Sequence, residues 1–233
     1  MSVNNPEPST PKGSALECVV SSVHAIYGKV ECAQSSFHDA AAQRGAALRC
    51  PPGCGACCEP YVPDVLPSEA AYAAAWILEN KPEIAAEIAA WPGENNPATP
   101  PCPFHRSSEL GARCAIYPAR FLLCRLFGAS GTRDREGHSN FRPCSHMPFA
   151  DYPFYGDARP GFSGEEIMRV FGVEPPFMTD YSAQLMSLSP SESGERSSLL
   201  EALPAALVRL GLCISLAARA PDPTYSTHDE REE

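Results

Sequence analysis

Cysteines are the residues whose type and spacing in this sequence could do chemistry. The chain of 233 residues contains 11 of them, and four fall within one short segment: Cys50, Cys54, Cys57 and Cys58. Cysteine thiolates bind metal ions at a sulfur–metal distance of about 2.3 Å. The two-residue gap between Cys54 and Cys57 allows the chain to turn so that both sulfurs face one ion, as in zinc and iron–sulfur sites. The spacing therefore predicts a thiolate metal site.

The adjacent cysteines limit what this segment can do alone. Side chains of neighbouring residues diverge, so Cys57 and Cys58 are not expected to bind one ion together with Cys54 in unstrained geometry. One of them would serve a second ion or pack as an inert thiol. A closed site therefore needs ligands from further along the chain, where three more cysteines follow: Cys102, Cys114 and Cys124.

Three arginines stand close to these downstream cysteines. Arg113 directly precedes Cys114, Arg125 directly follows Cys124, and Arg120 lies four residues before Cys124. A guanidinium group beside a thiolate lowers the pKa of the thiol and offsets the negative charge of a tetrathiolate site. We therefore expect the three arginines to help bind the cofactor, with ordinary solvated surface residues as the alternative.

Four short motifs resemble the YkgJ-type cysteine-cluster family, also described as a zinc- or iron-chelating CxxCxxCC domain. They are Cys54-Gly55-Ala56-Cys57-Cys58, Cys102-Pro103-Phe104, Arg113-Cys114-Ala115-Ile116-Tyr117, and Arg120 through Cys124-Arg125. The resemblance spans about residues 50–127. It implies a metal-chelating domain whose ligands fall among Cys50, Cys54, Cys57, Cys58, Cys102, Cys114 and Cys124.

The sequence departs from the family pattern in two places. Three residues separate Cys50 from Cys54 where the family has two, and Phe121 follows Arg120 where the family usually has proline. Cys144 lies beyond the core pattern and is expected as an additional ligand, whereas His146 is not expected to bind metal. The other cysteines are expected to be small buried hydrophobes within helices: Cys18, Cys32 and Cys213.

Eight candidate cysteine ligands suffice for two four-coordinate sites, or for one cluster with spare thiols. Because eight thiols exceed what one structural zinc needs, we favour iron, as an iron–sulfur cluster, over zinc. A redox or iron-handling role would follow, with a protein redox partner and, if the chain is an enzyme, an iron-dependent oxidoreductase activity. No Ser-His-Asp arrangement, phosphate-binding glycine loop or dinucleotide fingerprint indicates a particular reaction, so catalytic residues stay unassigned.

Two other functions fit the same cysteines. In the first, zinc only staples loops between helices, and the chain is a structural or interaction module without catalytic activity. In the second, the cysteines form disulfides in an oxidising compartment. The first thirty residues show no secretory signal and no segment reads as a membrane span, because Pro204 and Arg209 interrupt the apolar stretch near the C-terminus. We therefore expect a cytoplasmic protein that binds metal and no membrane.

The net charge of −10, with only three lysines, lacks the clustered cations that a polyanion requires. Nucleic acid is therefore not an expected partner. The polar, proline-rich ends, residues 1–13 and the acidic 221–233, are expected to be disordered tails around a single helical domain of residues 14–220. Its metal-binding core is expected at about residues 50–145.

The elements that must position the cysteines are mostly helices. Apolar residues at helical spacing predict one long helix or a pair broken near Gly28 between residues 14 and 48, and further helices from Ser68 to about residue 80 and from Pro82 to Trp91. Residues 121–123 are expected to form a helical turn that carries Cys124 inward. The expected fold is mainly α, with little strand, around an irregular cysteine-bearing centre.

Two helices are expected near the C-terminus. The spacing of Ser163 and Glu166 predicts a capping box before a helix that ends at Gly172. A last helix from about residue 197 is expected to be a core helix that packs four apolar side chains: Leu203, Leu207, Leu210 and Ile214.

Overall fold

The computed structural model describes residues 6–48, 50, 54–91, 101–107, 113–144, 146–147, 161–188 and 195–219. Most of these residues are helical, which confirms the predicted mainly α fold class. The helices are α1 (Ala15–Gln43), α2 (Pro67–Asn80), α3 (Pro82–Ala89), the 3-10 turn η1 (Tyr117–Ala119), α4 (Leu122–Leu126), α5 (Glu165–Phe171), α6 (Met178–Met186) and α7 (Leu199–Ala217).

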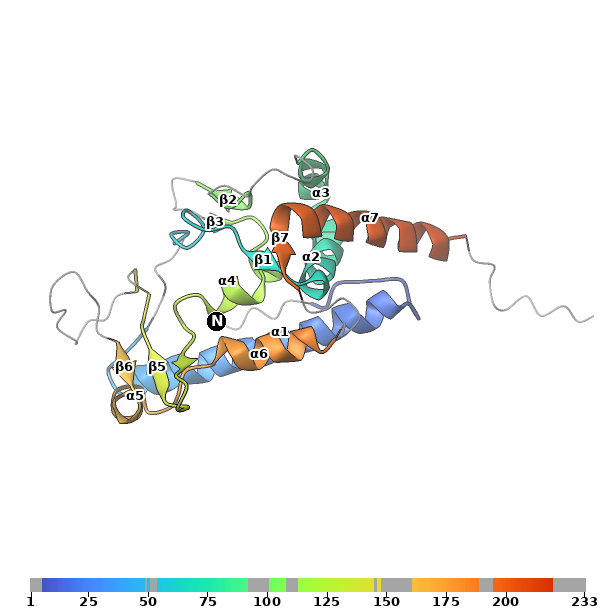
Figure 1. Cartoon of the computed structure of the whole chain (residues 1–233). Coiled ribbons are helices and arrows are strands. Elements are labelled where there is room, and N and C mark those ends of the chain that lie inside the picture. The colour runs from blue at the N-terminus through green and yellow to red at the C-terminus, as the bar shows by residue number, and fades with distance from the viewer. Residues whose placement is uncertain are drawn as a thin grey trace, which may run out of the picture.

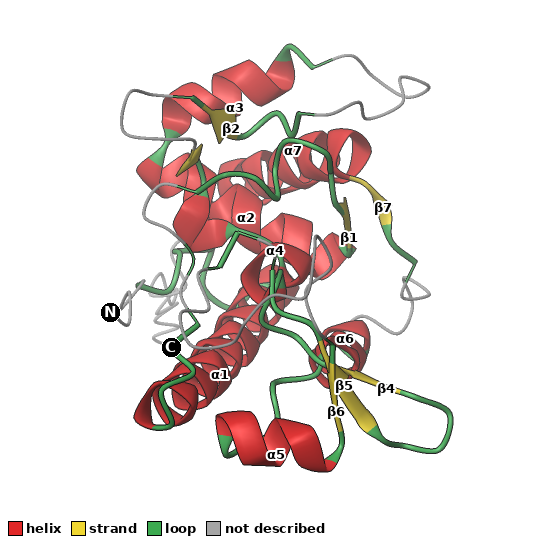
Figure 2. Ribbon diagram, turned by 90° about the vertical axis from the view of Figure 1, so that its left-hand side faces the viewer, coloured by secondary structure: helices red, strands yellow, loops and turns green. Residues whose placement is uncertain are grey.

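Short antiparallel strands join the loops between these helices. Strand β1 (Asp64–Val65) pairs with β7 (Ser197–Ser198), and β2 (His105–Arg106) pairs with β3 (Arg113–Cys114). A three-stranded sheet has the order β4 (Thr132–Arg133), β5 (Ser139–Phe141) and β6 (Phe162–Ser163). The figures place this sheet near α5 and α6, and β2 and β3 toward the end that holds α3 (Figures 1 and 2).

Helix α1 is the longest element and connects two hydrophobic clusters. Ser14 caps it by accepting a hydrogen bond from the Glu17 backbone N–H at 3.1 Å, and the helix runs unbroken through Gly28. At 1.5 Å per residue its 29 residues extend about 44 Å. Its buried face packs into the first cluster up to Val30, and from Phe37 onward into the second.

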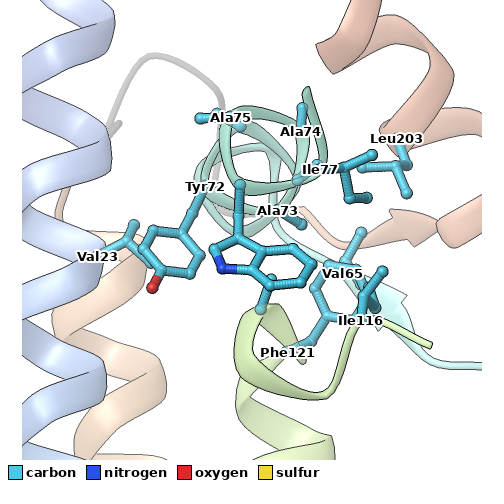
Figure 3. Close-up of a cluster of buried hydrophobic side chains, with 14 of the residues drawn as sticks. Val23, Val65, Tyr72, Ala73, Ala74, Ala75, Ile77, Ile116, Phe121 and Leu203 are labelled. Atoms are coloured by element: carbon cyan, nitrogen blue, oxygen red, sulfur yellow. The ribbon is translucent and has the colours of Figure 1, made fainter. Parts of the chain in front are cut away.

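The first hydrophobic cluster surrounds α2, which lies between α1 and α7 (Figure 1). Every residue of α2 from Ser68 to Ile77 is buried, because its alanines let neighbouring elements approach closely on all sides. Tyr72 meets Tyr27 of α1 edge to face, with ring centroids 5.2 Å apart. Ile116 and Phe121, which come from the cysteine-bearing segment, enter the same cluster (Figure 3).

The second hydrophobic cluster lies at the C-terminal end of α1 and is rich in aromatic rings. Phe171 of α5 packs edge to face against Phe141 of β5 at 5.3 Å and against Phe162 of β6 at 5.0 Å. Phe37 of α1 completes the group, 5.1 Å from Phe141. The small sheet is thereby attached to the long helix.

Helix α7 is much less buried than a core helix. Its N-cap Ser198 accepts a hydrogen bond from the Leu200 backbone N–H at 3.3 Å, and Leu203 and Leu210 are buried. Ile214, however, is 46% exposed, so its predicted core position is wrong. By length and composition α7 could cross a membrane; its mean hydropathy is 1.8 and only 17% of the tested window is buried.

Two predicted helix starts are also wrong. Helix α2 begins at Pro67 after Leu66, so Ser68 lies inside the helix instead of capping it. Ser163 belongs to β6, where it pairs with Asn140, and α5 starts after Gly164. Because Ser163 pairs in the sheet, it does not serve as the N-cap that the predicted capping box required. The predicted stop at Gly172 is confirmed, with a positive φ of 82°.

The predicted N-terminal tail lies partly outside the described residues, which exclude 1–5, and the predicted C-terminal tail lies wholly outside them, since 220–233 are excluded. Their disorder therefore stays a prediction. Within the described part, the Ser9 hydroxyl donates to Glu79 Oε1 of α2 at 3.0 Å.

Candidate metal centre

A tight turn brings the two adjacent cysteines together. The Cys58 backbone N–H donates to the Gly55 carbonyl at 2.8 Å, and the Sγ atoms of Cys57 and Cys58 are 3.9 Å apart. Two sulfurs on one tetrahedral ion, each about 2.3 Å from it, are about 3.8 Å apart. The expectation that these side chains diverge is therefore wrong, and both sulfurs have a spacing that suits a shared ion.

Cys102 is fastened directly to this turn. Its backbone N–H donates to the Cys58 carbonyl at 2.8 Å, and its own carbonyl accepts from the His105 N–H at 2.8 Å. The Cys102 side chain is only 7% exposed and belongs to the first hydrophobic cluster. Two loops more than forty positions apart in sequence are thus held side by side by backbone hydrogen bonds.

Strand pairing then brings Cys114 to the same place. In the β2–β3 ladder Cys114 stands opposite His105, and the next residue, Ala115, donates its N–H to the Phe104 carbonyl at 2.8 Å. Ile116 anchors the following segment in the first cluster, and the short helix α4 carries Cys124 against the same core. The predicted helical turn before Cys124 is close to α4, which starts at Leu122.

The structure thus assembles an inner group of cysteines on the first hydrophobic cluster. Burial, together with the neighbouring thiols Cys102 and Cys57, raises the pKa of Cys114 to about 11. Burial likewise raises the pKa of Cys124 and of Cys102, with contributions from other thiols of the group. Because each negatively charged thiolate disfavours ionisation of its neighbours, a metal cation bound among them would be strongly favoured. The inner group consists of Cys57, Cys58, Cys102, Cys114 and Cys124.

Cys57 is the acidic member of the inner group. A hydrogen bond from the Cys58 thiol, together with the nearby Arg120 guanidinium, lowers the pKa of Cys57 to about 6. The pKa of Cys58 is raised by the same hydrogen bond and by burial. The pair therefore shares one proton, with the negative charge on Cys57.

The remaining three candidate ligands form an outer group: Cys50, Cys54 and Cys144. Partial desolvation, together with the nearby thiols Cys54, Cys144 and Cys57, raises the pKa of Cys50 to about 12. Cys144 packs against the second hydrophobic cluster and against Gly128, where an added Cβ would lie 2.5 Å from the Cys144 Cβ. Residues 51–53 and 145 fall outside the described part of the chain.

The thiol sulfurs are suitable metal ligands, but they do not converge on one common position. Among the described residues, no three of them lie within 4.8 Å of one another. Within the described part of the chain, the one set of three ligand atoms that meets this distance is exposed at the tip of the β4–β5 hairpin. It comprises Asp134, Glu136 and His138. Donor type and mutual electrostatics therefore support metal binding by the inner group, and a shared ion requires its side chains to draw together.

The three candidate arginines differ in their surroundings. Arg120 lies over the Tyr117 ring, 3.9 Å from the centroid, and its charge lowers the pKa of both Cys57 and Cys114. The structure describes only the backbone of Arg113. Its role and that of Arg125 in cofactor binding stay predictions.

Arg125 is buried and its contacts connect α4 to neighbouring elements. Its guanidinium donates to Glu31 of α1 and to the Pro118 and Arg120 carbonyls, at 2.6 and 2.8 Å for the two carbonyls. The same group lies 4.0 Å from the centroid of the Tyr27 ring. Arg125 therefore supports the segment between Cys114 and Cys124.

Glu69 is a supporting residue whose tertiary role the sequence did not reveal. Its fully buried carboxylate accepts from the Leu66 N–H at 3.1 Å, the Tyr27 hydroxyl at 3.0 Å and the Leu122 N–H at 2.7 Å. It also pairs with Arg196 at 3.0 Å. Nothing local in the sequence indicated its contacts with α1 and α4.

The cysteines outside both groups are more accessible than expected. Cys18 and Cys32 are exposed on α1, and Cys213 is half-buried on α7, so the prediction of buried hydrophobes is wrong. His146 is exposed.

Comparison with protein families agrees with these cysteines. Residues 49–145 match the family CxxCxxCC, described as a putative zinc- or iron-chelating domain. The match covers all eight candidate ligands and confirms the resemblance seen in the sequence. Comparison with curated proteins finds no match, and comparison with solved structures finds none either.

Proposed function

We propose that this chain, whose residues 49–145 match the CxxCxxCC domain, binds iron as an iron–sulfur cluster held by the inner group and has a redox or iron-handling role. The observation that carries the proposal is the convergence of thiols from separate segments: Cys58, Cys102, Cys114 and Cys124 pack in the first hydrophobic cluster, and Cys57 lies 3.9 Å from Cys58. Iron–sulfur clusters take four thiolates. The inner group supplies that number with one thiol to spare.

The surroundings of the inner group suit a redox centre. Phe104 is 2% exposed beside Cys102 and excludes water from that side, and exclusion of water helps to set the potential of a thiolate-bound metal. Tyr117 and Phe127, in contrast, are 52% and 41% exposed. Water is therefore excluded from one side of the inner group, whereas another side is accessible, as electron exchange with a protein partner requires.

The residues of the chain have separable tasks in this function. Cys57 offers a thiolate near neutral pH because its pKa is lowered to about 6, so the other thiols release their protons as the metal enters. Arg120 offsets part of the negative charge that accumulates. When bound, the cluster would supply one-electron chemistry.

A zinc staple is the second candidate, and one observation favours it. The segments that carry the inner group have little regular structure: the two-residue strands β2 and β3, the 3-10 turn η1 and the five-residue helix α4. Segments with so little hydrogen-bonded structure gain stability directly from a bound metal. Zinc would hold them without redox activity.

Anaerobic purification distinguishes the two candidates. We expect iron in the purified chain by elemental analysis, visible sulfur-to-iron charge-transfer absorption, and an EPR signal after reduction or oxidation. Stoichiometric zinc with a colourless protein would contradict the iron proposal and support the staple. Because thiolate sites persist in reducing compartments, we also propose a cytoplasmic location, which cell fractionation tests.

A further inference from the structure

A cavity of about 710 Å³ lies beside the metal centre and is not explained by metal binding. Its walls come from α4 and the loop after it, from β4, and from the start of α6. Its volume is within the range of about 300–1,000 Å³ that is usual for sites of small molecules. The cavity thus has the size of a ligand site.

Three arginines line this cavity in a chain whose net charge is −10: Arg133, Arg142 and Arg196. The lining contains one carboxylate residue, Asp64. Arginine guanidinium groups bind carboxylates and phosphates through paired hydrogen bonds. The local charge is therefore opposite to that of the whole protein and favours an anion.

Two of the arginines are held in place by the protein. Arg196 pairs with the buried Glu69 at 3.0 Å and donates to the Ser182 hydroxyl at 3.2 Å. Arg133 pairs with Asp180 at 2.9 Å and lies 3.6 Å from the centroid of the Phe177 ring. These contacts orient both guanidinium groups and offset their charges.

Arg142 differs from the other two arginines in its contacts within the described part of the chain. Among the residues that the structure describes, no carboxylate forms an ion pair with it. It follows β5 directly and is exposed. An anion in the cavity would therefore bind most favourably to the guanidinium group of Arg142.

The start of α6 adds further donors. Met178 and Thr179 line the cavity at the first positions of this nine-residue helix, where backbone N–H groups carry partial positive charge. The Met178 N–H is already bonded to the Ser130 hydroxyl at 2.9 Å. The helix end therefore supplements the arginines with its remaining N–H groups.

Apolar side chains form another part of the lining. Leu123, Leu126, Phe127 and Met178 contribute carbon surface, with Phe127 41% exposed. A bare inorganic anion would leave this surface uncovered. A ligand that matches both parts has an apolar body and one anionic group.

The cavity shares its wall with the metal centre. Leu123 directly precedes Cys124 of the inner group, and Gly128 packs against Cys144 of the outer group. We propose that this cavity binds a small organic anion with an apolar body, whose carboxylate or phosphate group is bound by Arg142. The site goes beyond the proposed metal function and does not require it.

Calorimetric titration of the full chain at low salt tests the site with four probes: phenylacetate, phenyl phosphate, inorganic phosphate and benzyl alcohol. We expect at least one of the first two to bind more tightly than the last two, and the tighter of them identifies the anionic group. Arg142→Gln should weaken that binding about tenfold, since a charge-assisted hydrogen bond is lost. Arg135→Gln, an exposed arginine on the β4–β5 hairpin outside the lining, is the matched control.

The outcomes are separable from those of the metal proposal. Equal binding by Arg142→Gln and the unaltered chain, binding of benzyl alcohol as tight as that of the anions, or no binding of either organic anion would overturn the cavity proposal. Metal content measured on the same samples reports on the metal proposal alone. A chain without iron that still binds the organic anion would contradict only the iron–sulfur function.

Discussion

The inner and outer groups of cysteines differ in what holds them in place. The inner group rests on the first hydrophobic cluster, and backbone hydrogen bonds connect its loops, such as the one from Cys102 to Cys58 at 2.8 Å. In the outer group Cys50 is exposed and Cys54 half-buried, and only Cys144 packs against a hydrophobic cluster, the second one. Burial and backbone support thus favour the inner group as the better-ordered ligand set.

This difference also divides a sequence motif. Cys54 and Cys57 have the spacing of a metal-binding pair, yet Cys54 neighbours Cys50 in the outer group, whereas Cys57 lies 3.9 Å from Cys58 in the inner group. The eight cysteines therefore fall into a group of five and a group of three, and Cys57 of the first also acts electrostatically on Cys50 of the second. Spacing in sequence predicted the existence of a thiol centre but not this division.

The largest expected effect comes from removing ligands of the two groups. Cys114→Ser should lose most of the bound metal, because it removes a buried inner thiol, whereas Cys50→Ser should retain most of it. Metal per chain after anaerobic purification is the measurement. Cys213→Ser on α7 is the control for removal of a thiol. Equal loss of metal in the inner and outer variants would contradict the comparison.

The next largest effect is expected from removing Glu69, which supports the inner group. Glu69→Ala leaves three donors without their acceptor, the Leu66 N–H, the Tyr27 hydroxyl and the Leu122 N–H, and leaves Arg196 without its carboxylate partner. We expect a loss of about 3–5 kcal/mol in the free energy of unfolding, since each buried donor left unsatisfied costs about 1–3 kcal/mol. Denaturant titration measures it.

Glu83→Ala is the matched control for that loss. Glu83 pairs with Lys81 on the surface at 3.7 Å, and such pairs contribute about 0–1 kcal/mol. If the Glu69 and Glu83 variants were equally stable, the role of Glu69 in support of α4 would be wrong.

The outer group can be disturbed through Gly128. Gly128→Ala introduces a Cβ 2.5 Å from the Cys144 Cβ at a φ of 73°. We expect about 2–4 kcal/mol of destabilisation from backbone strain and overpacking together, measured by thermal unfolding. Gly137→Ala, with a φ of 87° and open space around it, should show only the backbone strain of about 1 kcal/mol. Similar losses in both variants would argue against close packing at Cys144.

The smallest expected effect is a difference in pH dependence within the inner group. In metal-free protein Cys57 has a pKa of about 6, so its thiolate predominates above that pH and is protonated below it. Its alkylation rate should therefore level off near neutral pH, measured by mass spectrometry of the labelled peptide. Cys58→Ala removes the hydrogen bond that lowers the pKa, so the rate should keep rising at alkaline pH. Identical profiles in the two proteins would contradict the shared proton.

Much of the fold was readable from local pattern. The apolar spacing of α1, the proline at the start of α3 and the glycine stop of α5 depend on neighbouring residues alone, and all three were predicted. Helix α6 and the sheet β4–β5–β6 were not. Strand pairing at β6 depends on residues more than twenty positions away, and a capping pattern at Ser163 could not reveal it.

What the sequence determined by itself was the chemistry: the set of thiols, their match to the CxxCxxCC domain and the helices that frame them. Only the tertiary structure decided which thiols meet, because hydrogen bonds and a hydrophobic cluster between distant segments set those distances. The same packing decided that Arg125 supports α4, that Ile214 faces outward, and that Arg142 borders a cavity beside the metal centre.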